Sequence, residues 1–277
     1  PQIYLLPLDG GEARAITDVA SGASSPAWSP DGKTIAFNSD TGVDDVKKSD
    51  EPKPAAEHKS DVTVVTQAVY RENGNPTYVD TQHHAHIFAV DVGSDEGRTR
   101  VGPGSDEGRT LLQKQITDGE FDEHGMQWSP DGSTIFFTST RVPEPWVMET
   151  GDALYRVPAA GGAIVKVASI DGTIGNISVS PDGRRIAFVG TLNGTPIRSY
   201  SQPDLWVTDA APGSTPKNLT ANYDYDISSG IGGDQAAPRG GNRKPIVWSK
   251  DGATLIVVSA EHGSSNLRRV TIATGKV

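Results

Sequence analysis

The segment His83-His84-Ala85-His86 carries three of the six histidines of the chain and is a candidate metal site. Histidine is a common metal ligand, and His84 and His86 would share one face of an extended strand. No cysteine or further carboxylate lies nearby in the sequence to complete a set of ligands. We therefore interpret the segment as a hairpin arm leading into the apolar run HIFAVDV, and we expect no bound metal.

Two further stretches resemble ion-binding or phosphate-binding loops. DGEFDEHG (118–125) is rich in acidic residues, but it lacks the twelve-residue spacing and the terminal glutamate of a calcium loop. GIGGDQAAPRGG (230–241) is rich in glycine, but a phosphate loop needs a strand before it, a helix after it and usually Gly-Lys-Ser/Thr. We predict a connection feeding the strand of Trp128 for the first, and a shaped structural loop for the second.

The segment RVPEPWVMETGD (141–152) places Arg141, Glu144 and Glu149 around Trp146. Such a group could contact a charged ligand. No motif supports that role, so we predict a solvated loop between two strands.

A serine nucleophile of the α/β-hydrolase type needs the pattern Gly-x-Ser-x-Gly on a strand-to-helix turn. The nearest stretches, GASSP (22–26) and GSSNL (263–267), lack the second glycine, and no alternation of strand and helix patterns is present. The chain has no cysteine, which excludes disulfides, zinc–thiolate sites and a thiol nucleophile. We therefore predict no catalytic, cofactor-binding or metal-binding residue and no cofactor.

The composition favours a protein of short strands and many turns. Glycine and proline number 31 and 19, and long helices tolerate neither residue in their interior. The formal net charge of −10 argues against nucleic acid as a partner, because an acidic surface repels phosphate backbones. No apolar run reaches the ~18 residues of a membrane span, so we expect no membrane insertion. The cellular compartment is not determined by the sequence.

One turn motif occurs four times and indicates an internal repeat. Its copies are Trp28-Ser-Pro-Asp-Gly32, Trp128-Ser-Pro-Asp-Gly132, Val179-Ser-Pro-Asp-Gly183 and Trp248-Ser-Lys-Asp-Gly252. Proline presets φ at the second turn position, aspartate bonds back to the backbone, and glycine adopts the left-handed conformation. An apolar run such as KTIAFNS or STIFFTS follows each copy, so each motif predicts a hairpin between two antiparallel strands.

Two more strand-like runs follow each hairpin, and this pattern is typical of a β-propeller blade of four short strands. We expect large side chains, among them Trp28, Trp128 and Trp248, to fill the space between neighbouring sheets. The motifs start 100, 51 and 69 residues apart, whereas such a blade takes ~40–50 residues. We therefore predict insertions at about 40–60, followed by a further hairpin at 61–80, and at about 93–110, where GSDEGRT occurs twice in an exposed, mobile loop.

The two ends of the chain predict incomplete blades. QIYLLPLDGGEARAIT (2–17) matches the third and fourth strands of a blade, and NLRRVTIATGKV (266–277) matches a third strand without a fourth. We predict an all-β fold in which residues 1–277 form part of a β-propeller, with about four to five blades of four-stranded antiparallel sheets. On this interpretation the chain is a fragment of a longer polypeptide.

Several long phrases resemble the N-terminal propeller of prolyl-oligopeptidase-family serine peptidases, most closely the acylaminoacyl-peptidase and dipeptidyl-aminopeptidase branch. They are IYLLPLDGGEARAIT, SDVTVVTQAVYRENG with the following HIFAVDV, RSYSQPDLWVTDAAPGSTPKNLT and YDYDISSGIGGDQAAPRGG. The resemblance implies a propeller that gates access of short peptides to a C-terminal α/β-hydrolase domain, which this chain lacks. The alternative is a free-standing, protein-binding propeller of the Tol-system type, and the sequence after Val277 would discriminate between the two.

Overall fold

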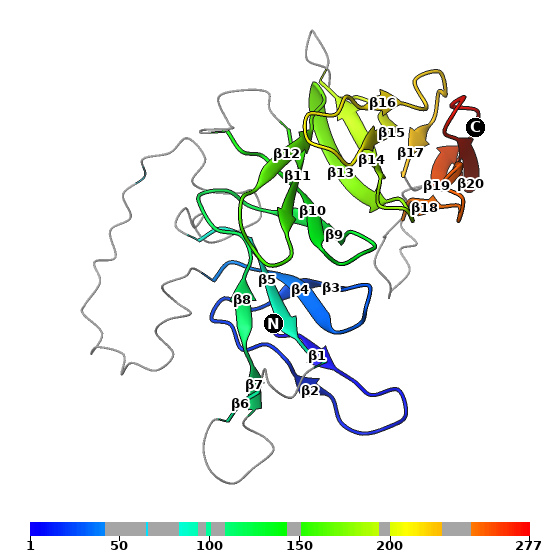
Figure 1. The fold of residues 1–277 in the computed structure, drawn as a ribbon. Helices are drawn as coiled ribbons and strands as arrows, with labels where there is room; N and C mark the ends of the chain where they lie inside the picture. The colour runs from blue at the N-terminus through cyan, green and yellow to red at the C-terminus, as the bar shows by residue number, and fades with distance from the viewer. Residues whose placement is uncertain are drawn as a thin grey trace. The chain divides into compact units, whose positions relative to one another are not determined.

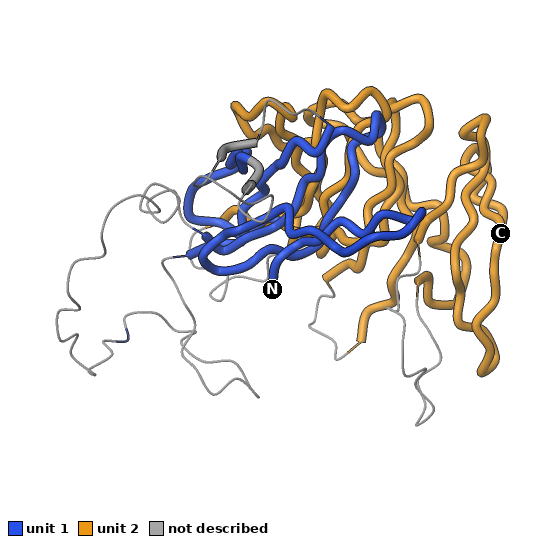
Figure 2. The backbone as a smooth tube through the Cα atoms, turned by 90° about the horizontal axis from the view of Figure 1, so that it is seen from below, with its two compact units in different colours: residues 1–123, 146–148 blue, residues 124–145, 149–277 orange. Residues whose placement is uncertain are grey.

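The computed structural model describes residues 1–41, 65, 83–93, 98–100, 109–142, 151–193, 200–228 and 245–277. These residues form strands joined by turns (Figure 1), and among them there is no helix that could span a membrane. They divide into two compact units, one containing the described residues up to Glu123 and the other those from His124 onward (Figure 2). The predicted insertion at 40–60, the hairpin at 61–80 and the loop at 230–241 lie almost entirely outside the described residues.

The first unit contains one four-stranded antiparallel sheet and two short strand pairs. The sheet has the order β3-β4-β5-β8, with strands Ser24–Trp28, Thr34–Ser39, His86–Asp91 and Gln113–Gln115. The pairs are β1 with β2 (Tyr4–Leu5, Arg14–Ala15) and β6 with β7 (Arg98–Arg100, Arg109–Leu111). The β6–β7 ladder corrects the sequence prediction of a loop throughout 93–110, because such a ladder needs only main-chain groups and leaves little trace in side-chain pattern.

The second unit contains three four-stranded antiparallel sheets. The first comprises β9 (His124–Trp128), β10 (Thr134–Ser139), β11 (Ala153–Pro158) and β12 (Val165–Ala168). The second comprises β13 (Gly172–Val179), β14 (Arg185–Leu192), β15 (Pro203–Asp209) and β16 (Lys217–Asn218). In the third, β17 (Asp226–Ile227) and β18 (Val247–Trp248) pair with one side of β19 (Thr254–Glu261), and β20 (Ser264–Thr271) pairs with the other.

All four repeated turns join two adjacent antiparallel strands of a four-stranded sheet, as the sequence predicted. In three sheets these are the first two strands, and in the third sheet of the second unit they are β18 and β19. The glycines that end the turns, Gly32, Gly132, Gly183 and Gly252, have φ of 69, 71, 71 and 64°, which is the left-handed region. The aspartate accepts a hydrogen bond from the main-chain N–H two residues later at 3.0–3.1 Å. The glycine conformation and the aspartate hydrogen bond both lie within the turn and the residue that follows it, so these features depend on neighbouring residues in the sequence.

The serine of each turn has a role that the sequence analysis did not assign. Its hydroxyl donates to the aspartate at 2.5–2.6 Å. The same oxygen accepts from the main-chain N–H of the residue that begins the next strand, at 2.9–3.0 Å. These bonds hold the pKa of Asp31, Asp131, Asp182 and Asp251 below the ordinary value, with the serine hydroxyl as the largest cause in each case.

Replacing Gly32 with alanine should lower the free energy of unfolding by about 1–2 kcal/mol, the cost of a left-handed backbone for an L-residue. A Cβ atom at Gly32 would meet no heavy atom within 4 Å, so the effect would come from the backbone and not from a clash. Asparagine tolerates this conformation better, so Gly32→Asn is the matched control and should cost less. Urea unfolding of the three proteins measures the difference, and equal losses for alanine and asparagine would contradict the explanation.

The centre of each of three sheets contains an aromatic pair at the same register of the second and third strands. The pairs are Phe37 with Phe88, Phe137 with Tyr155 and Phe188 with Trp206, with ring centroids 5.7, 6.0 and 6.2 Å apart. Such directly opposed aromatic pairs stabilise a sheet beyond the burial of their area. All three phenylalanines of the second strands are fully buried.

In the second unit, successive sheets pack face to face through two apolar clusters. One joins Phe136 and Leu154 of the first sheet to Ile174 and Phe188 of the second. The other joins residues of the second sheet, including Leu205, to residues of the third. This face-to-face packing buries the side of each sheet that a lone blade would leave exposed.

The predicted wedging by tryptophan is correct for one residue and wrong for another. Trp248 packs partly buried against the cluster between the second and third sheets, and its Nε1 donates to the carbonyl of Ser178 at 3.1 Å. Trp28 is 52% exposed. The apolar runs of the second and third strands, and not the residue before the turn, therefore supply most of the buried surface.

Candidate functional site

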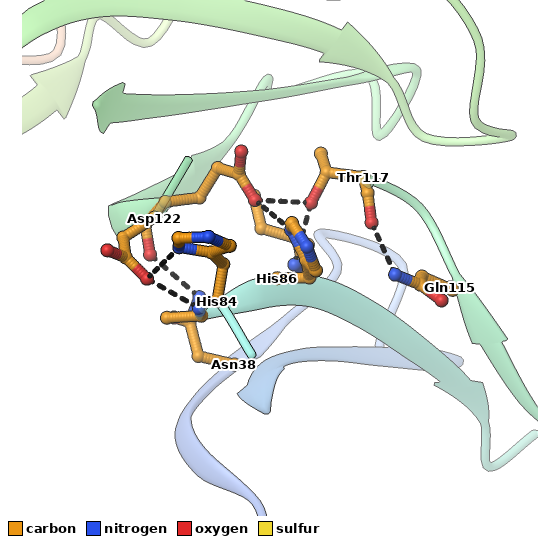
Figure 3. Close-up of polar contacts among 9 residues, drawn as sticks. Asn38, His84, His86, Gln115, Thr117 and Asp122 are labelled. Atoms are coloured by element: carbon orange, nitrogen blue, oxygen red, sulfur yellow. Dashed lines mark hydrogen bonds and ion pairs between the residues drawn. The ribbon is translucent and has the colours of Figure 1, made fainter. Parts of the chain in front are cut away.

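The strongest concentration of buried polar groups lies in the first unit, beside the start of β5 (Figure 3). It joins His86 at the start of β5 to the connection between β8 and β9, which contains Thr117, Asp122 and Glu123. These groups are brought together from positions more than 30 residues apart in the sequence.

Glu123 is the centre of this network. Its side chain is completely buried, and Oε2 lies 2.9 Å from Nδ1 of His86 and accepts a hydrogen bond from Oγ1 of Thr117 at 2.7 Å. His86 and Thr117 are themselves only 5% and 2% exposed. A buried carboxylate is tolerated when it is paired and hydrogen-bonded, and both conditions are met here.

Main-chain bonds fix the same connection against β5. The N–H of Ala85 donates to Oδ1 of Asp122 at 2.7 Å, and the N–H of Glu123 donates to the carbonyl of Ala85 at 2.8 Å. Nδ2 of Asn38, on β4, donates to the carbonyl of Glu123 at 2.9 Å. The arrangement holds the start of the third strand, the end of the second and the outgoing connection in one place.

The threonine of this network belongs to an arrangement that occurs at two four-stranded sheets and at the β1–β2 pair. In each, a threonine that follows the last strand accepts from a main-chain N–H in the preceding strand or next to it, and donates to a nearby polar side chain. Thr17 accepts from the N–H of Ile3 and donates to Gln2. Thr117 accepts from the N–H of Ile87 and donates to Glu123. Thr220 accepts from the N–H of Leu205 and donates to Asp204. The recurrence agrees with the interpretation of β1 and β2 as the third and fourth strands of a blade, which stays a prediction from the sequence.

His84 and His86 of the candidate metal segment are each paired with a carboxylate instead of with each other. Nδ1 of His84 lies 3.5 Å from Oδ1 of Asp122, and the ring centroids of His84 and His86 are 6.3 Å apart. Among the described residues, no group of three or more histidine, aspartate or glutamate side chains is arranged to hold a metal ion. The network is best explained as a structural one that holds the start of β5 against the connection between β8 and β9.

Sequence analysis could not have found this partnership, since His86 and Glu123 are 37 residues apart. It did place residues 118–123 correctly, as the connection into the strand of Trp128. For the segment 141–152, only its ends are described, and Arg141 is not a solvated loop residue. Its guanidinium carbon lies 5.9 and 5.5 Å from the ring centroids of Phe137 and Tyr155, so it stacks on the sheet.

A second polar cluster lies at the end of β19 in the second unit. Glu261 is nearly buried and receives hydrogen bonds from the guanidinium of Arg268 and the hydroxyl of Tyr223. Beside it, the hydroxyl of Tyr225 lies 2.7 Å from Nε2 of His262. The Arg268 guanidinium, followed by the Tyr223 hydroxyl, lowers the pKa of Glu261 from 4.5 to about 2.

This shift predicts a defined pH dependence of stability. Because the pKa of Glu261 is lower in the folded chain, the ionised pair stabilises the fold above pH 4.5 and loses this contribution as the pH falls towards about 2. Glu261→Gln should therefore be less stable than the parent chain at pH 7, and the difference should shrink below pH 4. Glu120→Gln, at an exposed carboxylate, is the control, and a difference that does not depend on pH would refute the assignment.

The serines of the two stretches nearest to a nucleophile motif lie in strands. Ser24 and Ser25 are in β3, and Ser264 and Ser265 are in β20. The part of the chain that the structure describes has no strand-to-helix turn on which a nucleophilic serine could be presented.

Four-stranded antiparallel sheets that begin with the same turn, and that stack through apolar clusters in the second unit, define a β-propeller. The comparisons with known proteins agree with this fold class. A search of protein-family models finds no match.

Two curated relatives match along almost the whole chain. An uncharacterized peptidase, YuxL of Bacillus subtilis, is 26% identical over 98% of this chain and 37% of its own length. Dipeptidyl-peptidase 5 of Porphyromonas gingivalis is 23% identical over 100% of this chain and 43% of its own length. The chain thus spans less than half of the relatives that it matches.

Solved structures show the same fold at low sequence identity. TolB from Acinetobacter baumannii matches 99% of this chain and 47% of its own, with a TM-score of 0.53 and 17% identity. A dipeptidyl aminopeptidase IV homologue from Bacteroides ovatus matches 95% of this chain and 36% of its own, with a TM-score of 0.53 and 13% identity. Prolyl oligopeptidase B from Galerina marginata matches 98% and 33%, with a TM-score of 0.52 and 13% identity. The two curated relatives carry the names of peptidases, as the resemblance inferred from the sequence led us to expect, and the solved structures show the propeller fold.

Proposed function

We propose that this chain is the substrate-gating propeller of a serine peptidase that acts on short peptides, of the acylaminoacyl or dipeptidyl type. In this proposal the propeller is itself non-catalytic and covers an α/β-hydrolase domain of the same polypeptide. The observation that carries it is the match along the whole chain to two peptidases, each more than twice as long as the matched region.

The sequence and the described fold are compatible with a non-catalytic role. The sequence has no Gly-x-Ser-x-Gly motif, and its two nearest serine segments lie in strands. The network around Glu123 and the apolar clusters between sheets make blades that hold their shape. A stiff cover of this kind would restrict a hydrolase site to peptides small enough to pass it.

A second candidate is a free-standing propeller that binds protein partners. It is favoured by the structural match to TolB, which covers 99% of this chain. The two candidates differ in one respect that can be measured, namely whether the intact polypeptide contains a reactive serine.

A fluorophosphonate probe tests the choice. The polypeptide that contains this sequence would be isolated from its source with an antibody raised against residues 1–277, and then labelled beside the purified 277-residue chain. Labelling of the intact polypeptide at a serine outside 1–277, with hydrolysis of short chromogenic peptides but not of casein, is the expected result. A folded, unlabelled polypeptide would favour the binding propeller, and labelling within 1–277 would contradict the non-catalytic role.

A further inference from the structure

One arginine fills the space between the second and third sheets of the second unit. Arg185, the first residue of β14, places its guanidinium carbon 5.4 Å from the ring centroid of Trp248. Its Nη2 donates to the carbonyl of Gly252, in the turn of the next sheet, at 2.7 Å. A Cβ atom on Gly252 would meet this nitrogen at 3.0 Å, so glycine leaves the room that the guanidinium uses.

Thr134 occupies the corresponding position in the preceding sheet. Both residues begin the second strand, and the carbonyl of each accepts from the N–H of the serine in the preceding turn, at 2.8 Å. Between the first and second sheets, Thr134 and the turn residue Gly183, which corresponds to Gly252, line a cavity of about 250 Å³. At this interface the ring of Pro130 stands beside the turn glycine, with Cδ 3.3 Å from where a Cβ atom of Gly183 would lie, and the open space lies next to it, beside Thr134.

The lining of this cavity has two carboxylates and one guanidinium, and Arg184 and Arg185 add positive charge near Asp182. Asp131 and Asp182 contribute two carboxylates, and Arg156 contributes one guanidinium, which donates to the carbonyl of Ala210 at 3.4 Å. The serine hydroxyls of the turns lower the pKa of both aspartates, that of Asp131 to about 2, so both are ionised at neutral pH. Among the described residues, hydrogen bonds reach only Oδ1 of Asp182, and its second oxygen remains available.

We propose that this cavity is a binding site for the side chain of an arginine presented by another polypeptide segment. The planar guanidinium has five N–H donors, so a single group can donate to the carboxylates of Asp131 and Asp182 together. Its charge would offset the excess of one carboxylate in the lining. The site does not depend on the proposed peptidase function, because it follows from the repeated geometry of the sheets.

The direct test is a titration of the purified chain with N-acetyl-arginine amide, monitored by amide chemical shifts in NMR spectra. N-acetyl-citrulline amide is the matched probe, since it has nearly the same shape without the charge. Saturable shifts of amides in the two turns, with citrulline at least tenfold weaker, are expected from the strength of charge-assisted hydrogen bonds. Equal binding of both probes would overturn the proposal.

Two sets of variants locate the site. Thr134→Arg should fill the cavity from within, abolish binding and raise the melting temperature by about 2–4 °C. Asp182→Asn should weaken binding at least fivefold, whereas Asp251→Asn removes the same turn interactions away from the cavity and should leave binding unchanged. If Thr134→Arg does not fold, the comparison of Asp182→Asn with Asp251→Asn still shows whether the probe binds in this cavity.

Two further outcomes would count against the arginine site. Equal effects of the two asparagine variants would show that the shifts report on turn stability and not on the cavity. Preferential binding of N-acetyl-aspartate amide, lost in Arg156→Gln, would show that the cavity selects an anion. Conversely, Arg185→Thr should open a second cavity beside Gly252 and add a second set of saturable shifts.

Discussion

Replacing Leu205 with alanine is expected to lower the free energy of unfolding by about 2–5 kcal/mol, the range for a fully buried leucine. Leu205 lies on β15 opposite Val189 and is 0% exposed. It belongs to the apolar cluster between the second and third sheets of the second unit. Truncation removes apolar contacts and leaves a cavity between two sheets that are held apart by their remaining side chains.

Leu267 provides an unusually close control. It lies on β20 opposite Val258, at the register that Leu205 has in the preceding sheet, but it is 72% exposed. Leu267→Ala should change the free energy of unfolding by less than about 0.5 kcal/mol. Urea unfolding followed by tryptophan fluorescence measures both, and comparable losses would mean that another surface covers Leu267 in solution.

Glu123→Ala should lower the free energy of unfolding by about 3 kcal/mol. The substitution leaves the Nδ1 of His86 and the hydroxyl of Thr117 without their shared carboxylate, in a region that excludes water. It also frees the connection that holds the start of β5. Thermal unfolding of the variant, with circular dichroism to confirm strand content, gives the size of the effect.

Glu120→Ala is the matched control for this prediction. Glu120 lies in the same connection but is exposed, so its loss should be close to neutral. Removing the hydroxyl donor instead, with Thr117→Val, should cost less than Glu123→Ala, because the histidine partner remains. If Glu123→Ala and Glu120→Ala are equally stable, the buried network does not hold the blade together.

The two ends of the strands in each sheet differ in how much their connections vary. At one end, the repeated turn joins two adjacent strands with nearly identical hydrogen bonds. At the other end, the strand after the turn is joined to the next strand by connections of very different length, namely 40–85, 140–152, 193–202 and 262–263. The repeated turn is thus a structural element, and the proposed arginine site lies beside it because the first residue of the following strand is Thr134 in one sheet and Arg185 in the next.

The sequence by itself determined the features that depend on neighbouring residues. The Ser-Pro-Asp-Gly bends, the hairpins that they close and the four-strand repeat follow from turn chemistry acting over about five residues, so they could be predicted without coordinates. The structural role of the turn serine is equally local, because its hydroxyl bonds to groups only two and five residues later in the chain.

Only the tertiary structure decided which distant groups meet. The pairing of His86 with Glu123, the exposure of Trp28 and the open space beside Thr134 depend on how strands and sheets are stacked. A single sequence specifies alternation along each strand, but the partner across a sheet or between sheets is set by register and packing over tens of residues. For this physical reason the fold could be predicted from the sequence, whereas the buried network around Glu123 and the cavity beside Thr134 could not.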